Sequence, residues 1–323
     1  MLVFLPNILI LYLFIAILED TGYMARAAFI MDKLMSKVGL HGKSFIPFVI
    51  GFGCSVPAIM SARMLENRKD RIVTILTVPF MSCSARLPVY LLFVSVFFDK
   101  YQGLILLGIY LVGILFAVIT SLILNKVSFK GVSKEFVLEL PPYRIPTVRN
   151  VLIHMWDKSV QYLKKMATII LAASVIIWAL EYFPRSNGDD MLTDNNIEYS
   201  YIGKFGHAIE PIMRPCGFDW RLGVALITGI AAKEVVVSTL GVLLDAEDED
   251  VSLKEKIRSI DGFTPHTAFG FMVFVLLCTP CIAALAAIRR EAGLKWAVFS
   301  AVYSTALAWI VSCLLFQLGN LLL

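Results

Sequence analysis

The chain of 323 residues is 58% hydrophobic and only 17% charged, which is more apolar surface than a soluble domain of this length can bury. Its mean hydropathy of +0.77 therefore excludes an ordinary soluble domain and predicts an integral membrane protein. The formal net charge of +4 gives no indication of a nucleic-acid partner.

Hydropathy along the chain predicts an all-α, polytopic helical membrane protein. A helix rises about 1.5 Å per residue, so roughly 20 apolar residues cross a hydrocarbon core of about 30 Å. Nine stretches are apolar enough to be embedded in a membrane. In chain order they are Leu2 to Leu18, Tyr23 to Met35, Ser44 to Met60, Arg71 to Phe98, Gln102 to Asn125, Met166 to Phe183, Arg221 to Leu244, Ala268 to Arg290 and Leu294 to Leu318.

Two of these stretches contain helix-breaking residues. Ser44 to Met60 contains two glycines and two prolines, and Arg71 to Phe98 is interrupted between Pro79 and Pro88. Proline frees a backbone carbonyl that lipid cannot satisfy, so such breaks persist only inside a protein or beside a wet cavity. In transporters, interrupted helices of this kind line the substrate site. The pattern therefore predicts broken or re-entrant helices that belong to a transport pathway.

The charges in the loops predict the topology. Basic residues outnumber acidic ones between Asn125 and Lys165, whereas acidic residues are in excess between Pro184 and Arg221. Because Lys and Arg mark the cytoplasmic side, the first loop is predicted inside and the second outside. Within the first loop, Thr147 to Lys165 has one apolar face. It is interpreted as an interfacial helix at the cytoplasmic surface, with a soluble helix that binds a partner as the alternative.

Thiols beside helix breaks are the main chemical feature of the chain. Cys54, Cys83 and Cys281 lie in broken segments, and Met81 is close to Cys83. Thiolate and thioether ligands favour a transition metal over Mg²⁺ or Ca²⁺. The alternative for each of these thiols is a small apolar residue in a packed core.

That alternative is preferred for the other three cysteines, Cys216, Cys278 and Cys313. Most of the cysteines lie in apolar segments and not in a loop framework, so no disulfide scaffold is expected. The apolar run starts at Met1 without a basic leader, and we expect the chain to begin partway into a larger protein.

Carboxylates in apolar surroundings are the second feature. Glu19 and Asp20 end the first apolar run, and Glu234 lies in another, next to Lys233. A charge inside the bilayer costs at least about 2.5 to 3.5 kcal/mol, so it usually pairs or lines a pathway. Glu234 is interpreted as functional, with Lys233 as a partial partner, whereas Glu19 and Asp20 fit a pathway or an interface equally well.

An internal repeat is also indicated by spacing. Two stretches each contain an acidic residue, a broken Cys/Pro segment and an arginine nine residues beyond the cysteine. These residues are Glu19, Cys54 and Arg63 in the first stretch and Glu234, Cys281 and Arg290 in the second. The spacing predicts that Cys54 and Cys281 are equivalent positions. The two arginines are interpreted as interfacial anchors, with counter-charges to the acidic residues as the alternative.

Five strings, in order, resemble the ferrous iron transport protein B (FeoB) family. They are LEDTGYMARAA at 18–28, GFGCSVPA at 51–58, PFMSCSAR at 79–86, ELPPYRIP at 139–146 and AKEVV at 232–236. The resemblance covers nearly the whole chain. It implies a permease with two gate-type repeats that moves Fe²⁺ inward across the bacterial cytoplasmic membrane.

By that resemblance, Cys54, Cys83 and Cys281 correspond to the gate cysteines of the family, and Glu19 and Glu234 to its intramembrane acids. Our hypothesis is that Fe²⁺ loses part of its water where the broken segments meet and is ligated by these thiols. The carboxylates then offset its charge. Fe²⁺ is expected as the transported substrate, and no permanently bound cofactor is expected.

The expected organisation has four parts. A first gate repeat with membrane helices covers 1–125, a cytoplasmic linker and amphipathic helix 126–165, a membrane helix and external loop 166–220, and a second gate repeat 221–323. Family members carry an N-terminal GTP-binding domain that this sequence does not contain. The chain is therefore expected to be a fragment or half of a split transporter, and not itself an enzyme.

The expected partners are a GTPase domain or subunit, a small cytoplasmic accessory protein of the uptake system, and the bilayer, with a homo-oligomer left open. Two other functions were considered. One is a gate-type permease for an organic substrate such as a nucleoside, whose site should be richer in amides and aromatic groups. The other is a noncatalytic membrane scaffold that docks a partner through the cytoplasmic loop.

Overall fold

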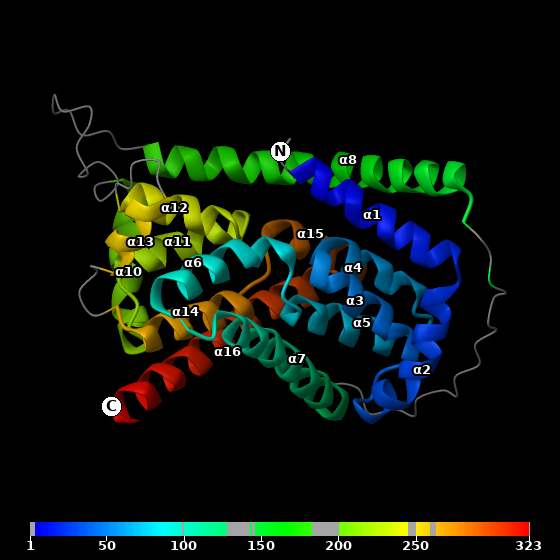
Figure 1. The fold of residues 1–323 in the computed structure, drawn as a ribbon, viewed down its shortest axis with the longest axis horizontal. Coiled ribbons are helices and arrows are strands. Elements are labelled where there is room, and N and C mark those ends of the chain that lie inside the picture. Colours follow the sequence, from blue (N-terminus) through cyan, green and yellow to red (C-terminus); the bar gives the residue numbers. More distant parts are fainter. Residues whose placement is uncertain are drawn as a thin grey trace. The chain divides into compact units, whose positions relative to one another are not determined.

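The computed structural model describes residues 4–98, 100–127, 143, 146–182, 200–244, 250–258 and 263–322. Within these ranges the chain forms helices and no β-strand (Figure 1). Four helical stretches are long and apolar enough to cross a membrane, namely Arg68–Phe97, Gln102–Val127, Pro265–Ala292 and Leu294–Leu321. The predicted class, an all-α polytopic membrane protein, is confirmed.

The helices follow one another with short connections. In chain order they are α1 (Phe4–Asp20), α2 (Tyr23–Lys37), η1 (Gly42–Ser44), α3 (Phe45–Gly53), α4 (Ser55–Ser61), η2 (Ala62–Met64), α5 (Arg68–Thr77), η3 (Val78–Phe80), η4 (Ser84–Arg86), α6 (Leu87–Phe97), α7 (Gln102–Val127), α8 (Val148–Tyr182), α10 (Tyr201–Met213), η5 (Arg214–Cys216), α11 (Trp220–Ala231), α12 (Val235–Leu243), α13 (Asp250–Arg258), α14 (Pro265–Leu277), α15 (Ile282–Ala292) and α16 (Leu294–Leu322).

These helices group into two compact units, each built from both halves of the sequence. The first unit comprises Met1–Cys83, Ile114–Ile169 and Ala286–Ala297, and the second comprises Ser84–Gly113, Ile170–Leu285 and Val298–Leu323. The broken segment that starts with α5 therefore passes from the first unit to the second after Cys83. The segment that starts with α14 passes from the second unit to the first within α15.

The core of the first unit is aliphatic. Apolar residues of α5 pack with residues from the turn after α2 and from the end of α7. The buried members are Leu40, Ile72, Val73, Leu76 and Leu124. A buried hydroxyl pair, in which Thr74 donates to Ser44 at 3.0 Å, joins α5 to η1. These contacts fix the start of α3 and hence the helix break that follows it.

The core of the second unit is aromatic and centres on α14. The ring centroid of Phe271 lies 5.0 Å from that of Phe93 and 5.5 Å from that of Phe218. Phe218 also meets Phe274 edge to face. Aromatic pairs at these distances add to the free energy of burial. Although the stretch Pro265–Ala292, which contains α14 and α15, has the composition of a membrane span, 78% of its most apolar window is buried inside the protein.

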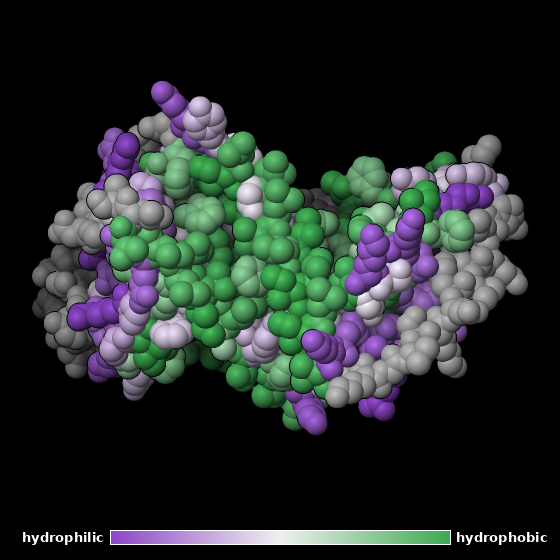
Figure 2. Space-filling view, turned by 90° about the horizontal axis from the view of Figure 1, so that it is seen from below, coloured by the Kyte–Doolittle hydropathy of each residue, from purple (hydrophilic) through white to green (hydrophobic). Residues whose placement is uncertain are grey.

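By contrast, α7 and α16 expose most of their apolar side chains. Only 22% of the apolar window of α7 and 28% of that of α16 are buried. Leu107, Leu111 and Leu115 are each more than half exposed. Figure 2 shows a face on which hydrophobic side chains predominate. Lipid is the medium that can cover such surfaces without cost.

The turns that follow α2 and η5 have the same backbone geometry. Gly39 and Gly217 both take a positive φ, at 75° and 76°. Two residues later, the side chains of His41 and Asp219 each accept a hydrogen bond from a backbone amide at the start of the next helix. Each pair is separated by 178 residues. The structure therefore contains an internal repeat in this register.

The same register continues into the helix breaks. Cys54, between α3 and α4, has φ −152° and ψ 130°, and Ala232, which is 178 residues later, has φ −151° and ψ 130°. The predicted equivalence of Cys54 with Cys281 is therefore wrong. The spacing was anchored on cysteines, whereas the backbone repeat is marked by glycines and helix caps. Each repeat has a second helix break further along the chain. By the order of the elements, the break after η3 in the first repeat corresponds to the break after α14 in the second.

One further difference concerns α8. The sequence predicted an interfacial helix over Thr147 to Lys165 and a separate membrane helix over Met166 to Phe183. The structure has one continuous helix of 35 residues across both stretches. On the predicted apolar face, Val151 is buried whereas Val148 and Leu152 are exposed. The proline-rich linker before this helix lies mostly outside the described residues.

Candidate functional site

The first helix break is made by a single residue. α3 ends at Gly53 and α4 begins at Ser55, so the extended backbone of Cys54 separates two helices that pack against each other. The amide of Cys54 donates to the carbonyl of Ile50 at 3.0 Å. Pro57 follows in the first turn of α4, where a missing amide hydrogen costs nothing. The break therefore places a thiol at the start of a helix.

α1 packs closely on this break. A Cβ at Gly53 would lie 2.5 Å from Cδ1 of Leu11, so a larger residue at this position would force the Leu11 side chain to move. The neighbouring Tyr12 is buried and interacts electrostatically with Cys54. The phenol and the thiol thus share one environment within the first unit.

The second break of the first unit brings a thioether to the same place. Met81, Ser82 and Cys83 separate η3 from η4, and η3 contacts both α3 and α4. A Cβ at Gly51 would lie 3.2 Å from Cβ of Met81, so the backbone just before Cys54 packs on Met81. Three sulfur-bearing residues predicted from sequence therefore lie on two breaks that pack together.

Ser82 adds an oxygen to this group. Its side chain is 1% exposed, and its hydroxyl has no hydrogen-bond partner among the described residues. A buried hydroxyl without a partner costs about 1 to 3 kcal/mol. Such an atom next to a methionine and a cysteine fits a site that is completed by a ligand.

The second unit contains the equivalent hairpin. Ala232, Lys233 and Glu234 separate α11 from α12. The hydroxyls of Thr228 and Thr239 lie 3.0 Å apart, although eleven residues of continuous helix would separate them by about 16 Å. α12 therefore folds back on α11, and this break was not predicted within the apolar stretch Arg221 to Leu244.

A buried lysine and a thiol connect this hairpin to the break after α14. Nζ of Lys233 donates to Sγ of Cys278 at 2.9 Å, and the two residues are only 3% and 7% exposed. The thiol lies 3.5 Å from the carbonyl of Val275, which accepts its hydrogen. Sequence reasoning missed this pair because it considered only the neighbouring Glu234 as the partner of Lys233. The apolar run around Lys233 was the available signal.

The other predicted site residues are placed less closely. Cys281 and Glu234 are half-buried in the second unit, where Glu234 directly follows Lys233 and Cys281 comes three residues after Cys278. Glu19 is exposed at the end of α1, seven residues and about 10 Å along the helix from Tyr12. Within the described ranges, no group of three or more His, Cys, Asp or Glu side chains forms a metal site. The metal-ligand set stays a prediction.

An ion pair links the two halves of the sequence within the first unit. The guanidinium of Arg63, in η2, binds both carboxylate oxygens of Glu291, in α15, with an Nε to Oε2 distance of 2.6 Å. This hydrogen bond raises the pKa of Arg63. Bidentate geometry gives the pair more strength than a simple surface contact. Arg63 was interpreted as an interfacial anchor, and its carboxylate partner was not predicted.

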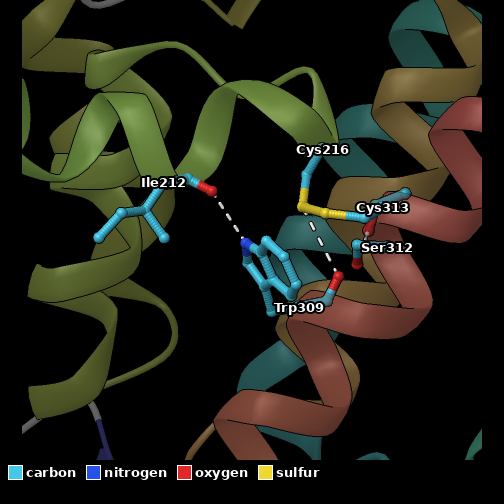
Figure 3. The surroundings of a disulfide bond; sticks show 6 residues. Ile212, Cys216, Trp309, Ser312 and Cys313 are labelled. Atoms are coloured by element: carbon cyan, nitrogen blue, oxygen red, sulfur yellow. Dashed lines mark hydrogen bonds between the residues drawn. A yellow bond between two sulfur atoms is a disulfide. The ribbon is translucent and has the colours of Figure 1, made fainter.

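A disulfide lies in the second unit, contrary to the expectation that Cys216 and Cys313 are ordinary core residues. It joins η5 to α16, with the two Cα atoms 4.1 Å apart. In Figure 3 the indole of Trp309 donates to the carbonyl of Ile212 beside it, at 2.9 Å. The pairing was missed because Cys313 lies inside an apolar helix. Cys54, Cys83, Cys278 and Cys281 are not disulfide-bonded.

The region near the disulfide also contains an apolar groove of about 740 Å³. Its walls include Met213, Phe274 and Trp309, and its only hydroxyl-bearing residues are Thr279 and Thr305. Thr279 is already bonded, because its hydroxyl donates to the carbonyl of Ala301 at 3.0 Å. A groove of this chemistry suits apolar groups, and it has no carboxylate, thiol or imidazole in its lining.

Comparisons with known proteins agree with the resemblance seen in the sequence. The model of the Gate family, described as "Nucleoside recognition", matches residues 1–97 and 163–295, which is more than half of the chain. The model described as "Ferrous iron transport protein B C terminus" matches residues 106–158. No solved structure matches the chain.

Curated relatives carry the same name. The chain is 50% identical over 99% of its length to an "Fe(2+) transport protein A/Fe(2+) transporter FeoB fusion protein" of Porphyromonas gingivalis, of which it covers 43%. It is 44% identical over its whole length to a Campylobacter jejuni "Fe(2+) transporter FeoB", covering 54% of that protein. A Staphylococcus aureus relative of that name is 42% identical, with 99% of this chain and 47% of the relative covered. The chain thus spans about half the length of the curated relatives it matches.

Proposed function

Because the chain belongs to the FeoB family and covers the membrane permease portion of its relatives, we propose that it forms the path by which Fe²⁺ crosses the bacterial cytoplasmic membrane. The relatives are named for Fe²⁺ transport, and the chain is a multi-pass membrane protein. GTP hydrolysis is then the task of another domain or subunit.

One observation carries this proposal, namely the group of sulfur atoms on two adjoining helix breaks. Cys54, Met81 and Cys83 provide two thiols and a thioether within the first unit, and the unpartnered hydroxyl of Ser82 lies between the last two in sequence. Soft ligands of this kind select transition metals over Mg²⁺ and Ca²⁺. Fe²⁺ lies near the weak end of the affinity series, so it can be released again.

The helix breaks explain how a partly dehydrated ion is accommodated. Helix α3 ends immediately before Cys54, and the backbone carbonyls that the end of a broken helix leaves unpaired are suitable ligands for a cation. In the first unit the ion would exchange water for Cys54, Met81 and Cys83. In the second unit Glu234 and Cys281 would supply a carboxylate and a thiol.

Membership of the FeoB family also suggests protein partners for the permease. One relative is named as a fusion of an Fe²⁺ transport protein A with the FeoB transporter. A small accessory protein of this type is therefore proposed to act together with the permease on its cytoplasmic side. Basic residues in the predicted cytoplasmic loop, 126–165, are the natural contact for it and for a GTPase.

The test is uptake of ⁵⁵Fe²⁺ by cells that carry the complete transporter. Cys54→Ser and Cys83→Ser should each reduce uptake by about tenfold or more, because replacing a soft ligand weakens metal binding by this order. Ser61→Ala is the matched control, since Ser61 lies at the end of α4 and its hydroxyl, among the described residues, bonds only to the carbonyl of Ala58. Unchanged uptake at normal membrane levels would remove the thiols from the path.

The description of the Gate family favours a second candidate, a permease for nucleosides. The described helix breaks carry thiols, a thioether, an amine and a carboxylate, but no amide side chain. An excess of unlabelled nucleosides distinguishes the two, because it should leave ⁵⁵Fe²⁺ uptake unchanged if the substrate is the metal.

A further inference from the structure

A buried cation already occupies the helix breaks of the second unit. Lys233 lies in the break between α11 and α12 with 3% of its side chain exposed, and its Nζ is 2.9 Å from Sγ of Cys278. A buried ammonium is costly unless an electron-rich partner compensates it. Here the partner is a sulfur atom, in the break between α14 and α15.

The internal repeat shows that this arrangement is particular to the second unit. The residue that matches Lys233 in the first unit is Ser55, 178 residues earlier, and it is also buried. The backbone at this break is the same in both units, since Cys54 and Ala232 have the same dihedral angles. The fold therefore does not require a lysine at this position.

We propose that Lys233 is a tethered cation, which occupies the cation position at Cys278 while no metal is bound and is displaced when the transported metal arrives. This inference rests on the proposed function, since it assigns Lys233 and Cys278 to the same path. Lys233 is then a positioning and selectivity residue, and it acts through the sulfur of Cys278.

Electrostatics explains what the lysine achieves. A metal ion bound to Sγ of Cys278 would lie within a few ångströms of an ammonium held at 2.9 Å from the same atom. At about 4 Å two unit charges repel by about 4 kcal/mol at an effective dielectric constant of 20, and a divalent ion is repelled more strongly. Binding therefore requires the ammonium to leave and the thiol to release its proton to water, and the return of both helps to release the metal.

The geometry allows such an exchange. Lys233 lies in a three-residue break, and its side chain has four rotatable methylene groups that can swing the ammonium away from the thiol. The hydroxyl pair of Thr228 and Thr239, at 3.0 Å, holds α11 and α12 together on either side of the break. The ammonium can thus move while the hairpin stays closed.

The test compares three lysine variants in the full-length transporter. Lys233→Met removes the charge at similar length, Lys233→Arg keeps it, and Lys43→Met removes a charge that pairs with the exposed Glu66 outside the breaks. Lys233→Gln is the second uncharged variant, should Lys233→Met not reach the membrane. Each is assayed for ⁵⁵Fe²⁺ uptake against concentration, and in detergent for the sulfur-to-metal charge-transfer absorption that Co²⁺ produces on binding.

Removal of the charge should lower the half-saturating Fe²⁺ concentration by about tenfold or more and strengthen the Co²⁺ signal. Lys233→Arg and Lys43→Met should resemble the wild type. Addition of Cys278→Ser to Lys233→Met should abolish the gain in signal, because the gain comes from that sulfur.

Two results would distinguish a failure of this inference from a failure of the proposed function. If the wild type takes up Fe²⁺ but Lys233→Met and Lys233→Gln change neither half-saturation nor the Co²⁺ signal, Lys233 is structural and the inference is wrong. If the wild type takes up no Fe²⁺, the proposed function fails. The Co²⁺ titration then still shows whether a cation and Lys233 compete for Cys278.

Discussion

The turn after α2 and the turn after η5 both contain a glycine with a φ near 75° but are held in place by different bonds. Gly39 packs on Asn125 of α7, whose amide donates to the carbonyls of Val38 and Gly39 at 3.3 and 2.9 Å. The turn at Gly217 is held to α16 by the disulfide between Cys216 and Cys313. In both repeats the turn is thus attached to a long helix, by hydrogen bonds in the first and by a disulfide in the second.

The predicted topology gives a physical reason for this difference. Asn125 precedes the loop predicted to be cytoplasmic, and Cys216 belongs to the loop predicted to be outside. Disulfides persist in oxidising surroundings and are rare in the cytosol. In the predicted topology, the hydrogen-bonded turn therefore lies toward the cytoplasm, and the disulfide lies outside, where oxidising surroundings preserve it. The orientation deduced from charge stays a prediction, with which a disulfide in the outer loop is compatible.

The helix breaks differ in the same manner. Those of the first unit gather sulfur atoms around Cys54 and Met81, whereas those of the second unit hold the Lys233–Cys278 pair. The first arrangement suits capture of a soft cation, and the second suits its release, because a fixed positive charge opposes binding. The two units share a backbone design and divide the chemistry between them.

Loss of the disulfide is the largest effect expected from this comparison. A bond between residues 97 apart in sequence stabilises a fold by about 2 to 4 kcal/mol. Cys216→Ser should therefore lower the thermal midpoint of the full-length transporter in detergent, as should a reductant acting on the wild type. Asn125→Ala, which removes the corresponding hydrogen bonds, should cost only about 1 kcal/mol.

The control for this prediction is the double variant Cys216→Ser/Cys313→Ser. Its midpoint should not respond to reductant, since it has no disulfide left to reduce. Equal losses for Cys216→Ser and Asn125→Ala would show that the disulfide adds nothing beyond the hydrogen bonds of the first turn.

A smaller effect is expected at the hydroxyl pair that closes the second hairpin. Thr228→Val leaves the hydroxyl of Thr239 buried without its partner and should destabilise by about 1 to 3 kcal/mol. Replacing both threonines by valine should cost much less than the sum of the single changes, because no polar group is then left unpaired. Thermal unfolding of the four proteins in detergent measures the coupling. Additive losses would mean that the two hydroxyls do not bind each other.

Much of this architecture could be predicted from sequence, because hydropathy alone marks long apolar helices and the proline- and glycine-rich breaks within them. The pairing of the repeats could not, since cysteines were used as markers while the backbone repeat is defined by Gly39 and Gly217. The Lys233–Cys278 contact was missed for a related reason. It joins residues 45 apart in sequence, and only tertiary structure shows that their helix breaks meet.

The smallest expected effect on stability comes from the difference between two capping side chains, His41 at the start of η1 and Asp219 at the start of α11. Nδ1 of His41 accepts a hydrogen bond from the amide of Lys43 at 3.2 Å, so the imidazole caps only while that nitrogen carries no proton. Burial lowers the pKa of His41 from its usual value of 6.5, although Asp70 and Asp32 partly oppose this. The folded protein thus takes up this proton less readily than the unfolded chain.

Stability from this group is therefore fully present above pH 6.5 and is lost as the pH falls through the lower pKa of the folded state. The loss should be less than about 1 kcal/mol, the usual value of a helix cap. His41→Asn keeps an acceptor that does not titrate, so its thermal midpoint should fall less than that of the wild type between about pH 7 and pH 5. Parallel curves for the two proteins would show that the imidazole does not cap η1. Because Asp219 caps α11 with a carboxylate, a difference between the curves would arise from the turn of the first unit alone.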